Sequence, residues 1–594
     1  MSISTLTDVL LVARDHDKAD CILHKVDGQY VPISTADLVR DIQQLAKTLS
    51  DLGIQRGDKV ALMAENGPHW PTVDFATLAL GAVLIPIYPT LTPEQAAYIV
   101  QDSGARIVFA QGTERLDGLE DQRSSLPDVE HLVLIGDASG RNLSTLAQLI
   151  DKGKGADPEA FEARCKENSA DDLATFIYTS GTTGNPKGVM LSHGNIVSNM
   201  LAGLQYLDIK GSFTALSFLP LSHSFERTVD YIYFYRGVTI AYAESVATVA
   251  QNLQEVRPHV FVSVPRVYEK VLAKVHENVA KGSPLSQKIF KWATDVARLS
   301  VPFRLKDQAP TGLLGIKLAI ADTLVFGKIR ARLGGRFQFA CSGGAPLGRE
   351  VAEFFWGIGI PIFEGYGLSE TSPILTTNFL ANARPGTVGK VIPGVEIKIA
   401  EDGEIIAKGP NIMQGYHNLP DATAEAIDAD GWFHTGDIGE FDEDGFLRIT
   451  DRKKELIINA YGKNIAPAPI ENALKASRFI GQAMVIGDRR KFLTALIVPD
   501  FEPLAAWAES QGLATGDMSA LLAQETIQKL FEEEIGKTNS ELAKYERVGA
   551  WELMPEEWTI EGGEMTPTLK VKRRIVNKKF ADVIEGIYAR AGEG

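Results

Sequence analysis

The sequence contains few cysteines and no long hydrophobic segment. Its three cysteines, Cys21, Cys165 and Cys341, lie far apart in a chain of 594 residues, so neither a disulfide framework nor a cysteine metal site is expected. No run of eighteen apolar residues occurs, which argues against a membrane-spanning helix. The N-terminal residues show no charged segment followed by an apolar one, so we expect no secretory signal. These absences favour a protein of the reducing cytoplasm.

Acidic residues outnumber basic residues in the chain as a whole, but the balance is reversed in one long segment. The net charge is −16, which argues against a general nucleic-acid-binding protein. Residues 266–336, however, contain fourteen Lys and Arg side chains against five Asp and Glu, an excess of nine positive charges. Apolar residues at helical spacing predict two basic helices here, near 285–299 and 313–333. Two interpretations remain open: solvated helices with one core face, or helices that contact an anionic membrane surface peripherally.

The chain of 594 residues is too long for a single core, and its hydrophobic pattern predicts an α/β organisation. Predicted strands at 59–64, 83–87 and 106–110 alternate with predicted helices at 70–80 and 93–101. Such alternation is typical of a doubly wound fold with a parallel sheet, in which ligands lie at the carboxyl ends of the strands.

The alternation of strands and helices occurs a second time along the chain. It is followed first by an antiparallel β pattern and then by an α+β pattern. Strands are predicted again at 215–219, 239–242 and 260–264, which indicates a second doubly wound subdomain. From about residue 387, two short strands flank the turn signal Glu401-Asp402-Gly403, and this predicts an antiparallel β-roll. After residue 455 the composition is that of a smaller α+β region.

One stretch is rich in hydroxyls and glycines: Tyr178-Thr179-Ser180-Gly181-Thr182-Thr183-Gly184-Asn185-Pro186-Lys187-Gly188. It follows an apolar strand, and a helix is predicted to begin near His193; a strand, a small loop and a helix commonly hold a phosphate. Glycines let the backbone approach a ligand, hydroxyls donate to phosphate oxygens, and Lys187 adds a positive charge. The spacing is not that of a Walker A loop. The alternative is a flexible surface loop.

Further polar or glycine-rich motifs follow predicted strands or turns. Each alone is a weak signal, because a lone histidine or a glycine turn is more often structural than functional. The motifs are Pro220-Leu221-Ser222-His223-Ser224-Phe225-Glu226-Arg227, Ser342-Gly343-Gly344-Ala345-Pro346-Leu347, Glu364-Gly365-Tyr366-Gly367-Leu368-Ser369-Glu370-Thr371, Gly431-Trp432-Phe433-His434-Thr435-Gly436-Asp437, Ile449-Thr450-Asp451-Arg452-Lys453-Lys454-Glu455 and Met565-Thr566-Pro567-Thr568-Leu569-Lys570-Val571-Lys572-Arg573-Arg574.

In this order the motifs resemble those of the adenylate-forming superfamily, which includes acyl-CoA synthetases, peptide-synthetase adenylation domains and firefly luciferase. The resemblance extends over almost the whole chain and is closest to long-chain fatty acid–CoA ligases. It implies an N-terminal adenylation domain over residues 1–450, with the basic helical insert at about 266–336 and the β-roll at about 387–450. It also implies a hinge at 451–454 and a small mobile C-terminal domain at 455–594.

The resemblance assigns roles to individual residues. The implied catalytic residues are Lys570, His223 and Glu370, the implied Mg²⁺ ligands are Glu370 and Thr182, and the implied hinge residues are Asp451 and Lys454. The residues implied in ATP or AMP binding are Thr179, Ser180, Gly181, Thr182, Thr183, Gly184, Lys187, Gly343, Gly344, Ala345, Glu364, Gly365, Tyr366, Gly367, Ser369, Asp437 and Arg452. The sequence departs from many relatives at Ser369, where they have Thr, and at Leu569, where they have Gly.

The activity that the resemblance implies has two steps. A long-chain fatty acid reacts with ATP to give acyl-AMP and pyrophosphate, and the acyl group then passes to coenzyme A, with Mg²⁺ as the metal. Three alternatives remain: loading of an acyl carrier protein, activation of shorter or aryl acids, and a non-catalytic nucleotide-binding or membrane-associated module. We expect a cytoplasmic protein without a nucleic-acid partner, and peripheral contact with the inner face of a membrane stays open. Monomer and homodimer also stay open.

Overall fold

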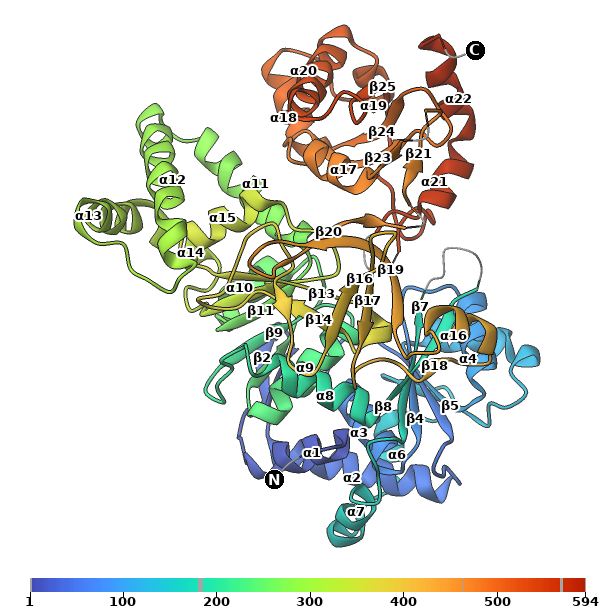
Figure 1. Cartoon of the computed structure of the whole chain (residues 1–594). Coiled ribbons are helices and arrows are strands. Elements are labelled where there is room, and N and C mark those ends of the chain that lie inside the picture. Colours follow the sequence, from blue (N-terminus) through green and yellow to red (C-terminus); the bar gives the residue numbers. More distant parts are fainter. Residues whose placement is uncertain (1–2, 180–184, 454, 462, 567–569, 593–594) are drawn as a thin grey trace. The chain divides into compact units, whose positions relative to one another are not determined.

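The computed structural model describes residues 3–179, 185–453, 455–461, 463–566 and 570–592. The chain forms two compact units, whose elements are labelled in Figure 1. The first unit comprises Met1–Lys398, Ile406–Thr435 and Asp442–Leu447. The second comprises Ile399–Ile405, Gly436–Phe441 and Arg448–Gly594.

The first unit contains a seven-stranded sheet in the order β18-β8-β7-β4-β3-β5-β6. From β7 to β6 all neighbouring strands are parallel, and β8 and β18 continue the sheet in antiparallel fashion. The strands are β3 (Lys59–Met63), β4 (Val83–Ile87), β5 (Ala105–Gln111), β6 (His131–Ile135), β7 (Leu173–Thr179), β8 (Lys187–Ser192) and β18 (Gly415–Tyr416). The helices between and beside them are α2 (Thr35–Asp51), α3 (His69–Ala79), α4 (Pro93–Ser103), α5 (Thr113–Asp121), α6 (Leu146–Lys152), α7 (Pro158–Cys165) and α16 (Pro420–Ala426).

Both faces of this sheet are buried, as parallel strands require. Side chains alternate across a strand, so Val60 and Leu62 of β3 enter one hydrophobic core while Ala61 and Met63 enter another. Residues of α2 and α3 complete the first core, and residues of α4 and α5 complete the second. The strands and helices predicted between residues 59 and 110 are confirmed.

A nine-stranded sheet forms the second α/β subdomain, in the order β15-β14-β13-β12-β11-β9-β10-β1-β2. The strands from β13 to β1 are parallel, and antiparallel strands close both edges. The strands are β1 (Ile22–Val26), β2 (Gln29–Ile33), β9 (Thr214–Ser217), β10 (Thr239–Tyr242), β11 (Val260–Ser263), β12 (Phe339–Ser342), β13 (Ile362–Gly367), β14 (Ile374–Thr377) and β15 (Lys390–Val391).

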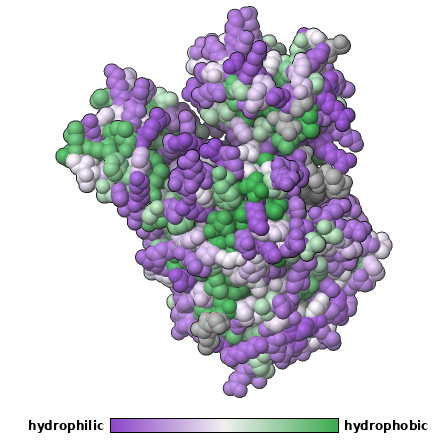
Figure 2. Space-filling view, in the orientation of Figure 1, coloured by the Kyte–Doolittle hydropathy of each residue, from purple (hydrophilic) through white to green (hydrophobic). Residues whose placement is uncertain are grey.

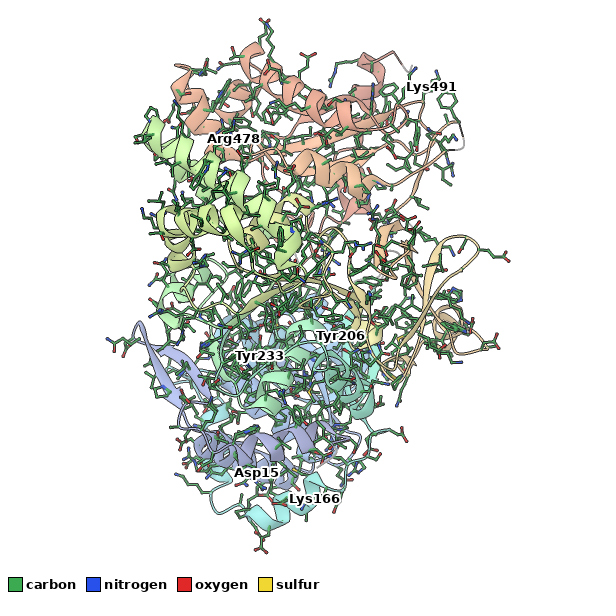
Figure 3. The ribbon with its side chains drawn as sticks, turned by 60° about the vertical axis from the view of Figure 1, so that its left-hand side comes forward. Asp15, Lys166, Tyr206, Tyr233, Arg478 and Lys491 are labelled. Carbon is green, nitrogen blue, oxygen red and sulfur yellow. The ribbon has the colours of Figure 1, made fainter. Side chains whose placement is uncertain are left out.

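The two sheets share one core. Ala215, Val260 and Phe363 of the nine-stranded sheet belong to the same buried cluster as Val60 of the seven-stranded sheet. Helices that supply residues to this layer are α1 (Leu6–Asp15), α2, α3, α8 (His193–Gly203) and α9 (Ser224–Arg236). Tyr233 of α9 is 1% exposed and lies within this layer (Figure 3). The predicted architecture of two doubly wound α/β subdomains is therefore confirmed.

Basic helices cover the outer face of the nine-stranded sheet, where a second core includes Phe261 and Ile362. The first predicted basic helix is α12 (Pro284–Arg304). The second is divided into α13 (Gly312–Ala321), a π-helical segment η2 (Asp322–Phe326) and α14 (Gly327–Arg332). Their neighbours are α10 (Val249–Val256), α11 (Pro265–Ala280) and α15 (Arg349–Gly357).

The structure corrects one expectation about the phosphate loop. The sequence predicts a loop between a strand and a helix, but Lys187–Ser192 forms β8, which pairs antiparallel with β7. Val189, Met190 and Leu191 extend an apolar strand pattern, and α8 begins only after Ser192, whose side chain caps that helix. The stretch between Thr179 and Lys187 therefore connects two strands, and α8 begins at His193, as predicted. Residues 180–184 lie outside the described part of the chain.

A separate four-stranded sheet has the order β16-β17-β19-β20. Its strands are β16 (Glu396–Ile399), β17 (Glu404–Lys408), β19 (Phe433–Phe441) and β20 (Leu447–Arg452). The predicted turn at Glu401–Gly403 is present, because the N–H of Gly403 donates to the Ala400 carbonyl over 2.9 Å and Gly403 has φ +85°. Both compact units include parts of this sheet, and the boundaries 1–450, 451–454 and 455–594 stay a prediction.

The rest of the second unit is α+β, as predicted. A three-stranded sheet of β23 (Ile480–Ile486), β24 (Leu493–Pro499) and β25 (Val548–Leu553) has separate hydrophobic cores on its two faces. The remaining elements are β21 (Ile457–Ile458), β22 (Asn464–Ile465), α17 (Pro467–Lys475), α18 (Phe501–Ser510), α19 (Met518–Leu522), α20 (Glu525–Glu541), α21 (Arg573–Lys579) and α22 (Ala581–Arg590).

A buried ion pair joins the elements that lie between the two sheets. Arg227 of α9 and Asp74 of α3 are each 3% exposed, and their Nη2 and Oδ1 atoms lie 2.5 Å apart. Tyr231 donates to Asp74 Oδ2 over 2.6 Å, and Arg227 Nη1 donates to Thr175 Oγ1 of β7 over 2.8 Å. Thr175 in turn donates to the Leu84 carbonyl over 2.6 Å. The network thus fixes α9 against α3 and β7.

Breaking this pair from one side tests its contribution to stability. Arg227→Met leaves the Asp74 carboxylate buried without its cation, and we expect a loss of about 3–5 kcal/mol in the free energy of unfolding. The double variant with Asp74→Leu and Arg227→Met removes both charges, so it regains most of that loss. Urea-unfolding midpoints of the full-length protein, followed by fluorescence, measure these differences.

An exposed ion pair provides the control. Arg141 and Asp117 are 45% and 48% exposed, so Arg141→Met is expected to change the midpoint far less than Arg227→Met. A loss in the double variant equal to the sum of the losses in the Asp74→Leu and Arg227→Met single variants would show that Arg227 and Asp74 are not energetically coupled.

Candidate active site

Thr179 and Lys187 mark the two ends of the predicted phosphate loop. They lie opposite each other on β7 and β8, and both are half-buried. Lys187 Nζ lies over the ring of Tyr416, 4.8 Å from its centre, in a cation–π contact. The loop residues assigned to ATP binding between them, Ser180, Gly181, Thr182, Thr183 and Gly184, lie outside the described residues.

Tyr416 connects Lys187 to Glu370. Its hydroxyl donates to Glu370 Oε1 over 2.9 Å. Burial and the nearby Glu370 carboxylate raise the pKa of Tyr416, so the hydroxyl keeps its proton and acts as the donor. Glu370 lies in the 3-10 helix η3 (Ser369–Thr371), directly after the carboxyl end of β13. The structure therefore places a cation, an aromatic ring and a carboxylate together where an open α/β sheet binds its ligands.

Ser369 links this group to the loop that carries His223. The Oγ atoms of Ser369 and Ser224 lie 3.2 Å apart, and both residues are buried. His223 is the N-cap of α9, and its Nδ1 accepts a hydrogen bond from the N–H of Phe225 over 3.1 Å. In the neutral ring this leaves the proton on Nε2. Two motifs 145 residues apart in the sequence are thus adjacent in the fold.

The glycine turn after β12 also lies beside the His223 loop. A Cβ on Gly343 would lie 2.8 Å from the ring of Phe225, so only glycine lets this turn pack flat against that ring. Gly344 has φ +79°, and Ala345 is exposed. The glycine turn that is predicted to bind the nucleotide therefore adjoins the loop of His223, a predicted catalytic residue.

The residues Glu364, Gly365, Tyr366 and Gly367 form the end of β13. A Cβ on Gly367 would lie 1.6 Å from the Pro373 carbonyl oxygen, which excludes any other residue type at this position. Tyr366 is half-buried, as a side chain that stacks on a base from one side would be.

Glu364 differs from the carboxylate of Glu370. It is 5% exposed, and its Oε1 accepts from the N–H of Gly386 over 3.1 Å. Burial raises the pKa of Glu364 to about 8, although the N–H of Gly386 acts in the opposite direction. Near neutral pH its carboxyl group is therefore protonated, and the side chain supports the chain at Gly386.

In the second unit, Asp437 and Arg452 form an ion pair. Arg452 Nε lies 3.0 Å from Asp437 Oδ1, and the two side chains are 45% and 5% exposed, respectively. Asp437 lies on β19 and Arg452 ends β20. Both residues were assigned to the nucleotide from the sequence, and the structure brings them together within this unit. A carboxylate held by a guanidinium can accept hydrogen bonds from a sugar diol.

Asp451 directly precedes Arg452 in the chain. It is 4% exposed, and its Oδ1 accepts from the N–H of Arg452 over 2.6 Å. Burial raises the pKa of Asp451 to about 7. Lys454, the other predicted hinge residue, lies outside the described part of the chain. The hinge assignment stays a prediction.

Lys570 lies in a short loop of the second unit. The N–H of Thr566 donates to the Lys570 carbonyl over 2.8 Å, and the N–H of Lys570 donates to Thr566 Oγ1 over 2.9 Å. Met565 and Val571 form an antiparallel bridge that closes the loop. Lys570 itself is exposed, so the loop presents its side chain at the surface of this unit.

Glu370 is the described residue that suits the predicted Mg²⁺. No cluster of three or more His, Cys, Asp or Glu suitable for a metal occurs among the described residues. Mg²⁺ in phosphoryl-transfer sites needs only one or two carboxylates, because substrate phosphates and water complete its octahedron. Glu370 is half-buried and held by Tyr416, which suits one such ligand. Thr182, the second predicted ligand, lies outside the described residues.

The sequence analysis missed Tyr416, and it assigned no role to Ser224 and Phe225, which lie within the motif around His223. Tyr416 comes from β18, a strand of two residues with no strong pattern around it. Ser224 and Phe225 directly follow His223, and their position after a predicted strand end was the available signal.

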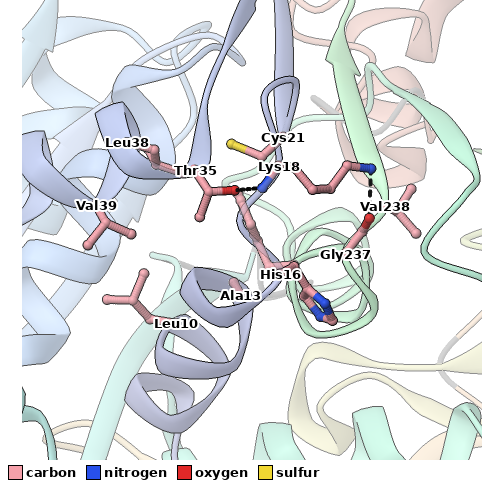
Figure 4. A pocket seen from close by; sticks show the side chains of 11 residues that line it. Leu10, Ala13, His16, Lys18, Cys21, Thr35, Leu38, Val39, Gly237 and Val238 are labelled. Atoms are coloured by element: carbon pink, nitrogen blue, oxygen red, sulfur yellow. Dashed lines mark hydrogen bonds between the residues drawn. The ribbon is translucent and has the colours of Figure 1, made fainter.

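A small cavity lies elsewhere in the first unit, between α1, α2 and α9 (Figure 4). Its volume of about 10 Å³ is near the lower limit for one water molecule. Lys18 Nζ, at its edge, donates to the Gly237 carbonyl over 2.8 Å. None of the predicted site residues lines this cavity, and it is a packing defect of the core.

Comparison with known proteins identifies the family. The AMP-binding enzyme family matches residues 12–417, and the AMP-binding enzyme C-terminal domain matches residues 454–592. The long-chain-fatty-acid–CoA ligase FadD15 of Mycobacterium bovis is 37% identical over 591 residues, which cover 98% of this chain and 96% of that protein. The long-chain-fatty-acid–CoA ligase ACSBG1 of Bos taurus is 34% identical, with 95% of this chain and 82% of that protein covered.

Solved structures agree on the fold. The adenylation domain of a carboxylate reductase from Mycobacterium chelonae matches with a TM-score of 0.77 and 22% identity, over 98% of this chain and 91% of that chain. ATP-bound MatB from Rhodopseudomonas palustris matches with a TM-score of 0.71 and 22% identity, over 98% and 100%. The predicted resemblance to adenylate-forming enzymes close to long-chain fatty acid–CoA ligases is confirmed, and the chain belongs to the family of AMP-binding enzymes.

Proposed function

We propose that this enzyme converts a long-chain fatty acid and ATP into acyl-AMP and pyrophosphate, and then transfers the acyl group to coenzyme A. The observation that carries the proposal is the group formed by Lys187, Tyr416 and Glu370 beside the phosphate loop. Full-length similarity to proteins named long-chain-fatty-acid–CoA ligases supports the substrate class.

The first step must bring two anions together. A free carboxylate is a poor acyl donor, because its leaving group would be oxide. The enzyme therefore joins the carboxylate to AMP as a mixed anhydride. One carboxylate oxygen attacks the α-phosphorus of ATP, and the bond to pyrophosphate breaks. Lys187, at the end of the phosphate loop, balances charge on the outer phosphates, which orients pyrophosphate to leave in line.

The fatty-acid carboxylate would enter beside His223. The ring is fixed because its Nδ1 accepts from the N–H of Phe225. Its Nε2–H side is then the one that can donate to a carboxylate oxygen. Ser369 lies next to this loop through Ser224, so its hydroxyl is suited to contact the α-phosphate while Tyr366 stacks on adenine.

Glu370 would hold Mg²⁺ together with Thr182 and substrate oxygens. When bound, the metal supplies positive charge that offsets the charge of the phosphates. Tyr416 positions Glu370 by donating to its Oε1 atom, so the carboxylate is held in a fixed orientation. In the second unit, Asp437 and Arg452 would bind the ribose hydroxyls.

Lys570 would serve the first step only. Its ammonium group offsets charge that develops between the carboxylate and the α-phosphate. In the second step the thiol of coenzyme A attacks the acyl carbonyl and AMP leaves, so that space must be vacated. We propose that residues 451–454 act as a hinge that rotates the small domain, 455–594, between the two steps.

A panel of acids distinguishes this proposal from its alternatives. We expect ATP–pyrophosphate exchange with palmitate-like acids, weaker exchange with short and aromatic acids, and a thioester once coenzyme A is added. Exchange without a thioester would instead indicate a carrier-protein acceptor, and exchange confined to aryl or short acids would replace the long-chain assignment. No exchange with any acid would contradict the enzymatic proposal.

Replacing the loop lysine separates the two half-reactions. We expect Lys570→Ala to lower acyl-AMP formation about 10²–10³-fold and to change thioester formation from supplied acyl-AMP far less. Lys578→Ala, which removes an exposed lysine of α21, is the matched control and retains both activities. Equal losses in both half-reactions for Lys570→Ala would count against domain rotation.

The group around Glu370 gives a graded series. We expect Glu370→Gln to lower pyrophosphate exchange about 100-fold and to raise the Mg²⁺ concentration for half-maximal rate. Tyr416→Phe removes only the 2.9 Å hydrogen bond, so a smaller change of the same kind is expected, about tenfold. Titrations of exchange rate against Mg²⁺ measure both variants. An unchanged Mg²⁺ requirement in Glu370→Gln would exclude Glu370 as a ligand.

A further inference from the structure

The helices α12, α13 and η2 expose large apolar side chains on one side of the insert. On α13 and η2 the exposed fractions are 68% for Leu313, 61% for Ile316, 47% for Ile320 and 45% for Leu324. Spacings of three and four residues place these side chains along one helical face. We call these four residues the insert face. Figure 2 shows hydrophobic residues gathered at this edge of the molecule.

The insert face is not the face that packs the helix into the protein. Leu318, Ala321 and Phe326 are buried and belong to the core beneath α12 and α15. The insert face is therefore a second apolar surface, on a helix whose ten residues include one charged side chain, Lys317. Soluble surfaces rarely keep large apolar side chains grouped in this way without a partner.

Basic residues surround the insert face. Lys317 lies next to Ile316 along α13, and Lys328 follows Leu324 by one turn. Within the described residues, seven exposed cations between 284 and 332 have no ion pair: Lys288, Lys291, Arg298, Lys306, Lys317, Lys328 and Arg332. Arg330 differs, since Asp322 neutralises it at 2.6 Å. These positive charges are thus available to an external anion.

We propose that the insert face docks on an anionic lipid bilayer, with its four apolar side chains among the acyl chains and the unpaired cations at the headgroups. An apolar face beside basic residues is the pattern of helices that lie in a membrane interface. Anionic lipids attract nearby Lys and Arg side chains. Among the described residues no helix is long and apolar enough to cross a membrane, so contact is peripheral.

Charge favours a bilayer over a second copy of this chain. The insert segment 266–336 carries an excess of nine positive charges in a chain whose net charge is −16. Two insert faces packed on each other would place like charges together, whereas anionic headgroups complement them. The proposal goes beyond the ligase activity and is independent of the acyl substrate, because it concerns only the surface of α12–α14.

The test measures partition of the full-length protein onto vesicles without ATP or fatty acid. We expect co-sedimentation with phosphatidylcholine vesicles that contain phosphatidylglycerol, and little with phosphatidylcholine alone. Replacing Leu313, Ile316 and Ile320 by Gln is expected to lower the partition coefficient at least about tenfold. Lys317→Glu together with Lys328→Glu is expected to lower it by a similar factor, more strongly at low salt.

Matched controls lie outside the insert. Val246→Gln replaces a side chain that is 61% exposed, and Lys152→Glu reverses an exposed charge on α6; both variants are expected to bind as the unchanged protein does. Melting temperature and pyrophosphate exchange with a short acid, measured without lipid, verify that each variant is folded. The absence of pyrophosphate exchange in the unchanged protein would count against the ligase proposal alone. The absence of vesicle binding would count against the docking proposal alone.

Three results would overturn the docking proposal. The first is an unchanged protein that does not bind anionic vesicles. The second is vesicle binding that persists in both insert variants. The third is a dimer, measured by light scattering, that the Gln variant dissociates while vesicle binding is absent; the insert face would then be a contact between copies.

Discussion

The buried ion pair between Arg227 and Asp74 determines how the two halves of the first unit meet. Two charges at 3% exposure carry a large desolvation cost, which is offset only when geometry is good and remaining polar atoms are bonded. Tyr231 and Thr175 supply those bonds. Since Arg227 lies one turn after His223 and Thr175 lies four residues before Thr179, the same network fixes the spacing between the His223 loop and the end of β7 at Thr179.

The aromatic ring between Lys187 and Glu370 has an electrostatic consequence. A direct ion pair would neutralise the lysine and the carboxylate, and neither would then be available to a ligand. Tyr416 holds both in place by different means, a cation–π contact with the ammonium group and a hydrogen bond to the carboxylate. Tyr416 therefore holds an ammonium group and a carboxylate at neighbouring positions of the candidate site.

The sequence predicted the strands and helices well where one element is long and periodic, as for the strand at 59–64 and the basic helix at 285–299. It missed β8 at Lys187–Ser192, because a short apolar run after a glycine-rich loop is ambiguous, and only pairing with β7 identifies it as a strand. The helix predicted to begin near His193 is confirmed as α8. Tyr416 could not be found, since its role depends on β18 pairing with β8 across more than 220 residues. Family motifs named Glu370 and His223, but their proximity through Ser369 and Ser224 is a property of the folded chain.

The uneven charge of the chain gives the insert an orienting role as well as a binding one. A protein with net charge −16 is repelled overall by an anionic bilayer, whereas the segment 266–336, with its excess of nine positive charges, is attracted to it. Attraction and repulsion therefore select one approach, in which α12–α14 meet the headgroups first. The apolar side chains of the insert face then contribute to the free energy of binding only once they are in contact with the bilayer. Long-range charge sets the orientation, and burial of apolar surface sets the residence time.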